Sequence, residues 1–168
     1  KYPVYIYDLP SVTQSPVTFG ILEALADSPN IKGLKTANLG LILEMQRNNY
    51  RDDHFSVFYS GLDLFDVAIP SGIKKNLDGM FTCTPFNSKK LYGDSKQDNM
   101  KNNSKYLNNM LTLRNIFLKE NIFSAYSYAM QLLGCPGNYQ SDYDLPVSEN
   151  LKEEIEEKST KLEKIGDL

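Results

Sequence analysis

The stretch Asn30-Ile31-Lys32-Gly33-Leu34-Lys35-Thr36-Ala37-Asn38 predicts a short β-strand with a lysine at its carboxyl-terminal end. The run is apolar enough to be buried on both faces, as strands of parallel sheets are. Lys35 would then leave the sheet into an enclosed space, where lysine is seldom found. Desolvation lowers the pKa of an ammonium, and the free amine can attack a ketone to form a Schiff base. The alternative is a strand-end lysine whose ammonium simply reaches solvent.

Segments on both sides of this strand alternate between strand-like and helix-like patterns. β-Branched and aromatic residues predict strands, and apolar residues three or four positions apart predict helices. The predicted strands are 3–7, 31–36, 55–60 and 77–84, and the predicted helices between them are 17–26, 39–45 and 64–69. This order indicates an α/β fold with βα units in a parallel sheet and right-handed crossovers.

The second half of the chain has a different pattern. Residues 88–104 are polar and predict either a loop or the solvated start of a helix, and helices are expected at about 106–117, 122–133 and 148–164. The stretch 138–146 is expected to be a loop. We therefore expect four βα units over residues 1–87 and, in the same domain, a helical extension over residues 88–168.

Composition restricts the class of protein. The 168 residues are 41% hydrophobic and 23% charged, which is ordinary for one globular domain. A formal net charge of -3 gives no basic surface for nucleic acid, and no apolar run approaches the roughly 18 residues that span a membrane. Cys83 and Cys135 lack the spacing of a metal site or a disulfide framework, which favours a reducing cytoplasm.

Polar side chains are expected to gather at the carboxyl-terminal edge of the sheet, where ligands bind in parallel βα folds. Tyr7 and Lys35 close the first two predicted strands, Gly61 and Asp63 follow the third, and Cys83 closes the fourth. An amine, a phenol and small polar groups in one pocket are suited to carbonyl chemistry. The alternative reading makes Tyr7 a core aromatic residue and Asp63 a helix cap.

Two motifs in this set resemble a known family. Tyr7-Asp8-Leu9-Pro10-Ser11, followed by Gly33-Leu34-Lys35, is similar to the pyruvate-dependent class I aldolases and lyases that include dihydrodipicolinate synthase and N-acetylneuraminate lyase. In that family Tyr-Asn-x-Pro-Ser/Ala ends barrel strand five and Gly-x-Lys ends strand six. Ser60-Gly61-Leu62-Asp63 resembles the end of strand seven, and 78–84 resembles strand eight.

The resemblance implies the second half, strands five to eight, of a (β/α)8 TIM barrel followed by C-terminal helices. Lys35 would form a Schiff base with pyruvate or a related 2-oxo acid, and Tyr7 would move protons beside it. Gly61, Asp63 and Cys83 would line the region that binds the rest of the substrate. The chemistry of the family needs no metal and no organic cofactor.

Three positions depart from the best-known members. Val12 stands where dihydrodipicolinate synthases carry an arginine, and Leu64 replaces the glutamate of sialic acid lyases. Asp8 stands where the family usually has asparagine. These departures favour a 2-keto-3-deoxy sugar acid as the substrate, with dihydrodipicolinate synthase as the alternative.

The resemblance also covers only half of the family's barrel. Strands one to four, with the loop that holds the pyruvate carboxylate, have no counterpart in these residues. We therefore expect the missing half or a second copy of the chain as a partner, in a homo-oligomer, and regard activity of the isolated 168-residue chain as doubtful. The competing hypothesis is a non-catalytic half-barrel that acts as a structural or interaction module.

Overall fold

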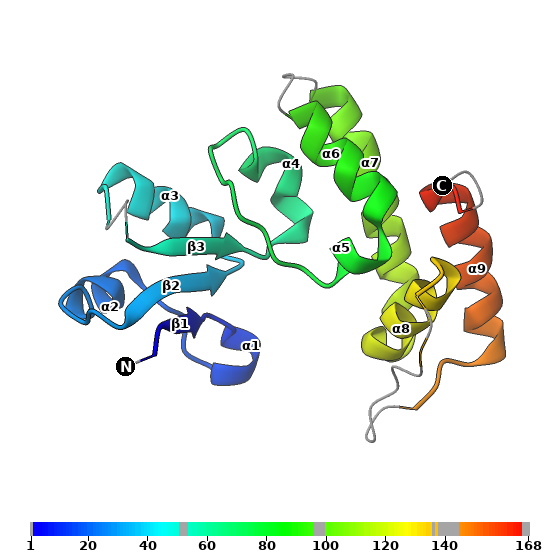
Figure 1. Ribbon diagram of the computed structural model, residues 1–168, viewed down its shortest axis with the longest axis horizontal. Coiled ribbons are helices and arrows are strands. Elements are labelled where there is room, and N and C mark those ends of the chain that lie inside the picture. The colour runs from blue at the N-terminus through cyan, green and yellow to red at the C-terminus, as the bar shows by residue number, and fades with distance from the viewer. Residues whose placement is uncertain (1, 51–53, 96–99, 136, 138–144, 166–168) are drawn as a thin grey trace. The chain divides into compact units, whose positions relative to one another are not determined.

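The computed structural model describes residues 2–50, 54–95, 100–135, 137 and 145–165. The chain divides into two compact units, one formed by Lys1–Leu64 with Ser71–Asp78 and the other by Phe65–Pro70 with Gly79–Leu168. The strands labelled in Figure 1 belong to the first unit, and the long helices α6 to α9 belong to the second.

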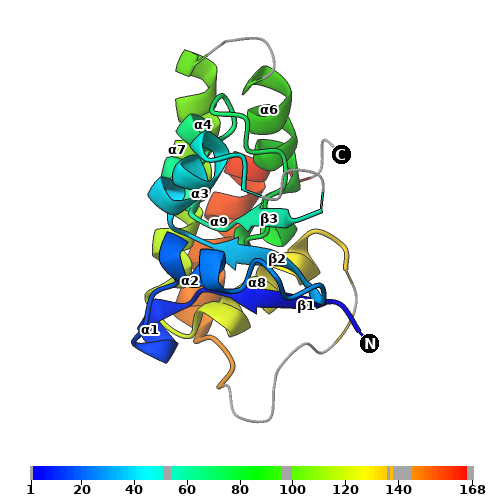
Figure 2. The same cartoon turned by 90° about the vertical axis from the view of Figure 1, so that its left-hand side faces the viewer.

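The first unit contains a parallel sheet of three strands in the order β1, β2, β3, which Figure 2 shows one above the other. The strands are β1 (Val4–Tyr7), β2 (Ile31–Thr36) and β3 (Ser56–Tyr59), so three predicted strands are confirmed, with the limits of β2 as expected. Tyr7 pairs with Lys35, and Lys35 pairs with Phe58. This register places the ends of the strands at one edge of the sheet.

Helices of the first unit cover one face of this sheet. They are α2 (Phe19–Ala24) and α3 (Leu39–Arg47), whereas α1 (Pro10–Thr13) is a single turn after β1 with no buried residue. The side chains of Thr18 and Asn38 begin α2 and α3 by accepting hydrogen bonds from backbone amides of the first turn. Their apolar faces bury Leu34 of β2 in a core whose other buried members are Leu22, Leu41, Met45 and Phe55. Leu34 of β2 thus faces the helices, and the next residue, Lys35, faces the opposite side of the sheet.

The predicted fourth strand at 77–84 is wrong. The extended segment lies earlier, where Asn76 forms a single parallel bridge to Tyr59, and the Leu77 amide donates to the Tyr59 carbonyl oxygen at 2.9 Å. Residues 80–83 instead form α5 (Met80–Cys83). The physical reason is the three-residue spacing of Met80 and Cys83, which buries both on one helical face, whereas a strand would turn them to opposite faces.

The second unit consists of helices. They are α4 (Phe65–Ala68), preceded in the first unit by the 3-10 turn η1 (Leu62–Leu64), then α5, α6 (Pro85–Ser95), α7 (Met100–Phe117), α8 (Ile122–Leu132) and α9 (Glu149–Glu163). The three predicted C-terminal helices are confirmed as α7, α8 and α9. The polar stretch 88–104 is helical where it is described, and most of the predicted loop at 138–146 lies outside the described residues. No helix in the described ranges is long and apolar enough to cross a membrane.

A buried carboxyl group joins the last helix to α6. Glu163 accepts hydrogen bonds from the backbone amides of Phe86 at 2.9 Å and Asn87 at 3.4 Å, and the Asn87 amide group donates both to Glu163 and to the Leu162 carbonyl oxygen. These contacts satisfy amides in the first turn of α6 that have no partner within the helix. Burial raises the pKa of Glu163 above its ordinary value, although the hydrogen bonds oppose the shift.

Candidate active site

Lys35 and Tyr7 lie in direct contact at the carboxyl-terminal edge of the sheet. The Lys35 ammonium donates a hydrogen bond of 2.9 Å to the Tyr7 hydroxyl oxygen. The same nitrogen lies 4.0 Å from the centroid of the Tyr7 ring, in the range of a cation–π contact. The pairing of β1 with β2 brings together two side chains that are 28 positions apart in the sequence.

The surroundings of Lys35 differ from the expected enclosed space. Lys35 is half-buried, and the Tyr5 and Tyr7 side chains beside it are 51% and 52% exposed. In the described part of the first unit, the helices pack against the Leu34 side of the sheet and not against the side that carries Lys35, which explains the partial exposure of Lys35. We call the other face, formed by Tyr5, Tyr7, Gly33, Lys35, Ser56 and Phe58, the open face.

Gly33 sets the packing of the open face one layer below Lys35. A Cβ atom at this position would overlap the Ser56 carbonyl oxygen and lie 2.5 Å from Cδ1 of Tyr5. The absence of a side chain therefore lets the Tyr5 ring lie against β2, where it meets the Phe58 ring edge-on with centroids 6.0 Å apart. The glycine of the Gly-Leu-Lys motif thus has a steric role in this structure.

Asp8 fixes the strand ends behind the Lys35–Tyr7 pair. This carboxylate is only 5% exposed. It accepts hydrogen bonds from the Thr36 hydroxyl at 2.6 Å and from the Val17 amide at 3.0 Å. The carboxylate therefore ties the residue after Tyr7 to the residue after Lys35, which limits relative sliding of the two strands.

Gly61 and Asp63 follow the end of β3, as predicted. A Cβ atom on Gly61 would overlap the Tyr59 hydroxyl group, so a glycine is required for the chain to pass over that ring. Tyr59 is buried, and its hydroxyl has no hydrogen-bond partner among the described residues. Burial, together with the negative charge of Asp63, raises the pKa of Tyr59.

Cys83 belongs to the second unit, unlike the other four candidate residues. Its side chain is 1% exposed, and the thiol donates to the Tyr126 carbonyl oxygen at 3.5 Å. Burial raises the pKa of this thiol to about 11. In this structure Cys83 is an enclosed, protonated residue of α5.

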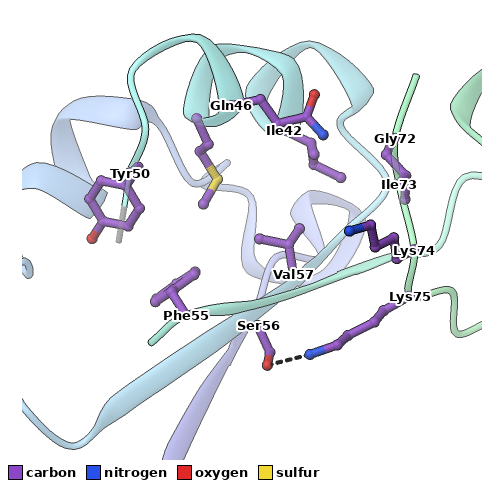
Figure 3. Close-up of a pocket in the computed structure, with 11 residues that line it drawn as sticks. Ile42, Gln46, Tyr50, Phe55, Ser56, Val57, Gly72, Ile73, Lys74 and Lys75 are labelled. Carbon is purple, nitrogen blue, oxygen red and sulfur yellow. Dashed lines mark hydrogen bonds between the residues drawn. The ribbon is translucent and has the colours of Figure 1, made fainter. Parts of the chain in front are cut away.

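A separate cavity of about 380 Å³ opens beside β3 in the first unit. Figure 3 shows it between α3 and the segment 72–75, with Val57 directed toward α3 and Ser56 on the other side of the strand. Its lining combines apolar side chains such as Ile42 and Phe55 with polar ones such as Lys74 and Lys75, and it includes neither Lys35 nor Tyr7. This cavity is therefore distinct from the candidate active site.

The arrangement can support chemistry that needs an amine and a proton carrier at contact distance. A lysine nitrogen can attack a carbonyl carbon, and a phenol within hydrogen-bond reach can give or take the protons of the following steps. Within the described ranges, no group of three or more His, Cys, Asp or Glu side chains is placed to hold a metal ion.

Two residues of this region were not singled out from the sequence. Thr36 and Tyr59 close β2 and β3 on the helix side and are both buried. The position of Thr36 directly after Lys35 could have indicated its role, because a hydroxyl group at the end of a strand can hydrogen-bond to a side chain at the end of the neighbouring strand. Tyr59 had no signal, since tyrosine is a common strand residue.

The sequence matches the family model of the Dihydrodipicolinate synthetase family over residues 1–165. No curated protein matches the chain.

Several solved structures have the same fold at low sequence identity. YagE, a prophage protein of the dihydrodipicolinic acid synthase family from E. coli K12 in complex with pyruvate, has a TM-score of 0.77 at 20% identity, over 97% of this chain and 56% of that one. A variant of 2-keto-3-deoxygluconate aldolase from Sulfolobus solfataricus has a TM-score of 0.80 at 14% identity, over 95% and 54%. A dihydrodipicolinate synthase from Bacillus anthracis has 0.79 at 16% identity, over 94% and 54%. The chain thus spans little more than half the length of these proteins.

Proposed function

This chain belongs to the dihydrodipicolinate synthetase family, and on that premise we propose that it is the C-terminal half of a Schiff-base-forming aldolase or lyase. In this proposal the three strands and the extended segment at Asn76 are strands five to eight of a (β/α)8 barrel. The contact between Lys35 and Tyr7 carries the proposal, because it joins the lysine and the tyrosine of the two motifs at a hydrogen-bond distance of 2.9 Å.

Lys35 acts as the nucleophile. Its neutral amine adds to the C2 carbonyl of pyruvate or of a 2-keto-3-deoxy acid, and loss of water leaves a protonated imine. This imine accepts the electron pair released when the bond between C3 and C4 breaks, so an enamine and an aldehyde form. In the synthetic direction the enamine carbon attacks the aldehyde, and water then releases the product from Lys35.

Tyr7 carries the protons of these steps. As the imine forms, the phenol gives its proton to the oxygen that leaves as water, and the resulting phenolate takes the proton of the C4 hydroxyl group when the bond between C3 and C4 breaks. The phenol then returns this proton when the enamine is protonated at C3. The hydrogen bond from Lys35 places the Tyr7 oxygen next to the reacting nitrogen before any substrate binds. The Asp8–Thr36 hydrogen bond supports this placement by holding the two strand ends together.

The rest of the substrate is assigned to residues that follow the later strands. Gly61 and Asp63 are proposed to line its binding region at the end of β3, whereas Cys83, which is enclosed in α5 of the second unit, is left out of this proposal. A 2-keto-3-deoxy sugar acid is the preferred substrate, since Val12 cannot bind a carboxylate as arginine would and Leu64 cannot accept hydrogen bonds from a polyol as glutamate would. Dihydrodipicolinate synthase activity remains the alternative.

A complete site requires more protein than these residues supply. The open face leaves Tyr5 and Tyr7 half exposed, and the chain covers only 54–56% of the length of the solved structures described above. We propose that four further βα units, or a second copy of the chain, close the barrel in a cytoplasmic oligomer. The same observations support the second candidate function, a non-catalytic half-barrel that serves as a structural or interaction module.

Trapping with borohydride distinguishes the two functions. The purified chain, and the assembled protein that contains it, are incubated with pyruvate and reduced, and the intact mass is measured. The aldolase proposal predicts one reduced pyruvate adduct per chain in the assembled protein. A protein that shows no adduct at any pH or pyruvate concentration would be the non-catalytic module.

A further inference from the structure

The cavity beside β3 has an apolar floor built from the first unit alone. It lies between α3, the start of β3 and the segment 72–75, all of which belong to that unit (Figure 3). Its volume of about 380 Å³ is in the range of small-molecule sites. The apolar side chains that line it are those of Ile42, Met45, Phe55, Val57 and Ile73. A floor of this kind favours contact with the hydrocarbon part of a ligand over contact with water.

Contacts within the first unit fix one wall of this cavity. The Tyr50 hydroxyl donates a hydrogen bond of 2.6 Å to the Leu22 carbonyl oxygen. The Tyr50 ring also meets the rings of Phe55 and Phe19 edge-on, with centroids 5.4 Å and 5.8 Å apart. This wall is in place without a ligand, so binding does not have to order it first, and that lowers the entropy lost on association.

One ammonium group is directed into the cavity. Figure 3 shows the Lys74 side chain extending from the segment 72–75 toward α3, on the Val57 side of β3. Lys75 lies on the other side of the strand, where its ammonium donates to the Ser56 hydroxyl oxygen at 2.7 Å. Among the described residues, none that lines the cavity is Asp or Glu, and the Lys74 ammonium has no hydrogen-bond or ion-pair partner. The cavity therefore presents a positive charge beside an apolar floor.

A neutral hydrogen-bond donor lines the same cavity. Gln46 is an exposed residue of α3, and its Nε2 atom lies 3.8 Å from the position that a Cβ atom would take on Gly72. Gly72 has a φ of 87°, in the left-handed region that favours glycine, so no side chain stands between α3 and the chain at this point. The Gln46 amide group makes no hydrogen bond within the part of the chain that is described. It can therefore donate to an anion that the Lys74 ammonium holds.

These two donors favour a ligand with a single negative charge. A carboxylate carries one charge, which the Lys74 ammonium balances, and its oxygens can accept hydrogen bonds from Lys74 and Gln46 together. A phosphate monoester carries about −1.5 to −2 charges and is often held by arginine. No arginine is among the described residues that line the cavity. A carboxylate thus matches the charge of this site better than a phosphate does.

We propose that this cavity binds a small monocarboxylic acid with an apolar body, of the branched-chain or aromatic kind. The carboxylate pairs with the Lys74 ammonium and accepts from the Gln46 amide, and the hydrocarbon part packs on the apolar floor. Neither Lys35 nor Tyr7 lines the cavity. The ligand is therefore a second molecule besides the 2-oxo acid of the proposed function, and its binding does not depend on the Schiff base.

Isothermal titration calorimetry with 3-phenylpropanoate tests the proposal, on the full chain or on the assembled protein that contains it. This probe has a carboxylate and an aromatic body but no ketone, so it cannot form an imine with Lys35. We expect one saturable site per chain. Lys74→Gln should raise the Kd about tenfold or more, because it removes a charge-assisted hydrogen bond. Lys74→Met replaces Lys74→Gln if the latter does not fold.

Matched variants and probes locate the site and its chemistry. Lys89→Gln removes a charge from an exposed position on α6 in the other unit and should bind the probe like the wild type. Lys35→Ala should also bind it normally. The neutral alcohol 3-phenylpropan-1-ol lacks the charge and acetate lacks the apolar body, so each should bind the wild type about tenfold or more weakly than 3-phenylpropanoate does.

Four results would overturn the proposal. They are the absence of saturable binding, an unchanged Kd in Lys74→Gln, loss of binding in Lys35→Ala, and an alcohol or acetate that binds as tightly as 3-phenylpropanoate. Tighter binding of 2-phenylethyl phosphate than of 3-phenylpropanoate would contradict the choice of a carboxylate.

The titration reports on Lys74, and pyruvate trapping reports on Lys35, so the two proposals can fail separately. A trapped adduct in a protein that does not bind 3-phenylpropanoate would leave the proposed chemistry intact and refute this inference. Binding that depends on Lys74, without any trapped adduct, would support this inference and refute the aldolase proposal.

Discussion

The Lys35 ammonium lies 2.9 Å from the Tyr7 hydroxyl oxygen and 4.0 Å from the centroid of the Tyr7 ring. Tyr7 thus contacts the lysine in two ways, through a hydrogen bond and through its aromatic face. The two contacts can be separated experimentally, because phenylalanine keeps the ring and removes the oxygen.

Tyr7→Phe in the assembled protein should lower kcat by about 10²-fold or more, the usual scale for loss of a general acid–base group. The fold and the cation–π contact should persist, since only one oxygen is lost. Tyr5→Phe on the same face is the control and should leave kcat within a few-fold of the wild type. Near-normal turnover in Tyr7→Phe would show that the Tyr7 hydroxyl group does not transfer protons and that Tyr7 contributes only through packing.

Gly33→Ala should destabilise the first unit. The new Cβ would overlap the Ser56 carbonyl oxygen and meet the Tyr5 ring, and overpacking of this kind costs about 1–3 kcal/mol. Gly93→Ala in α6 is the matched control, because no atom lies within 4 Å of its added Cβ and alanine favours a helix by roughly 0.5–1 kcal/mol. Urea unfolding of both variants checks the prediction. Equal stabilities would show that β2 and β3 adjust to a larger residue.

Cys83 should resist alkylation in the folded chain. Burial raises its pKa to about 11, so at pH 8 only about one thiol in a thousand is ionised. Cys135 is also a free thiol, and its side chain is more exposed. Iodoacetamide followed by peptide mapping should label Cys135 while Cys83 stays unmodified until the protein is unfolded. Rapid labelling of Cys83 in the native protein would contradict the enclosed position.

Glu163 should make stability depend on pH in a defined direction. Burial raises its folded-state pKa above the unfolded value near 4.5, so the folded protein binds a proton more tightly than the unfolded chain does. The stability gained from this proton is fully present below about pH 4.5 and is lost as the pH rises through the folded-state pKa. Relative to Glu163→Gln, the wild type should therefore lose stability as the pH is raised from about 4.5 through the folded-state pKa.

Urea unfolding of the wild type and Glu163→Gln across this pH range gives the required difference. Glu163→Ala, measured in parallel, should be less stable by about 1–3 kcal/mol, because it leaves the Phe86 and Asn87 amides without their acceptor. A wild type that gains stability over Glu163→Gln as the pH rises would mean that the hydrogen bonds outweigh the desolvation of the carboxylate.

Much of the local structure could be predicted from the sequence because it follows from local patterns. The limits of β2 agree with its apolar run, and α3 begins at Leu39, where its apolar spacing predicted a helix. The fourth strand was mispredicted because β-branched and aromatic residues around Met80 outweighed the helical spacing of Met80 and Cys83. Short segments of this kind are decided by packing and not by propensity.

The candidate site could be predicted only in part. The proximity of Tyr7 and Lys35 follows from two parallel strands in register, which the motif spacing already indicated. The exposure of the face that carries them could not be read from the sequence of β2, because burial of the second face depends on what packs there. The hydrogen bond between Asp8 and Thr36 likewise depends on the register of the two strands and on no local pattern.

Mapping the pyruvate adduct tests the central claim most directly. The assembled protein is reduced with borohydride in the presence of pyruvate and digested, and the modified lysine is identified by mass spectrometry in the wild type, in Lys35→Ala and in the control Lys32→Ala. We predict that the adduct lies on Lys35, that Lys35→Ala shows none, and that Lys32→Ala is labelled like the wild type. An adduct on Lys32, Lys74 or Lys75 in the wild type, or full labelling of Lys35→Ala, would contradict the account.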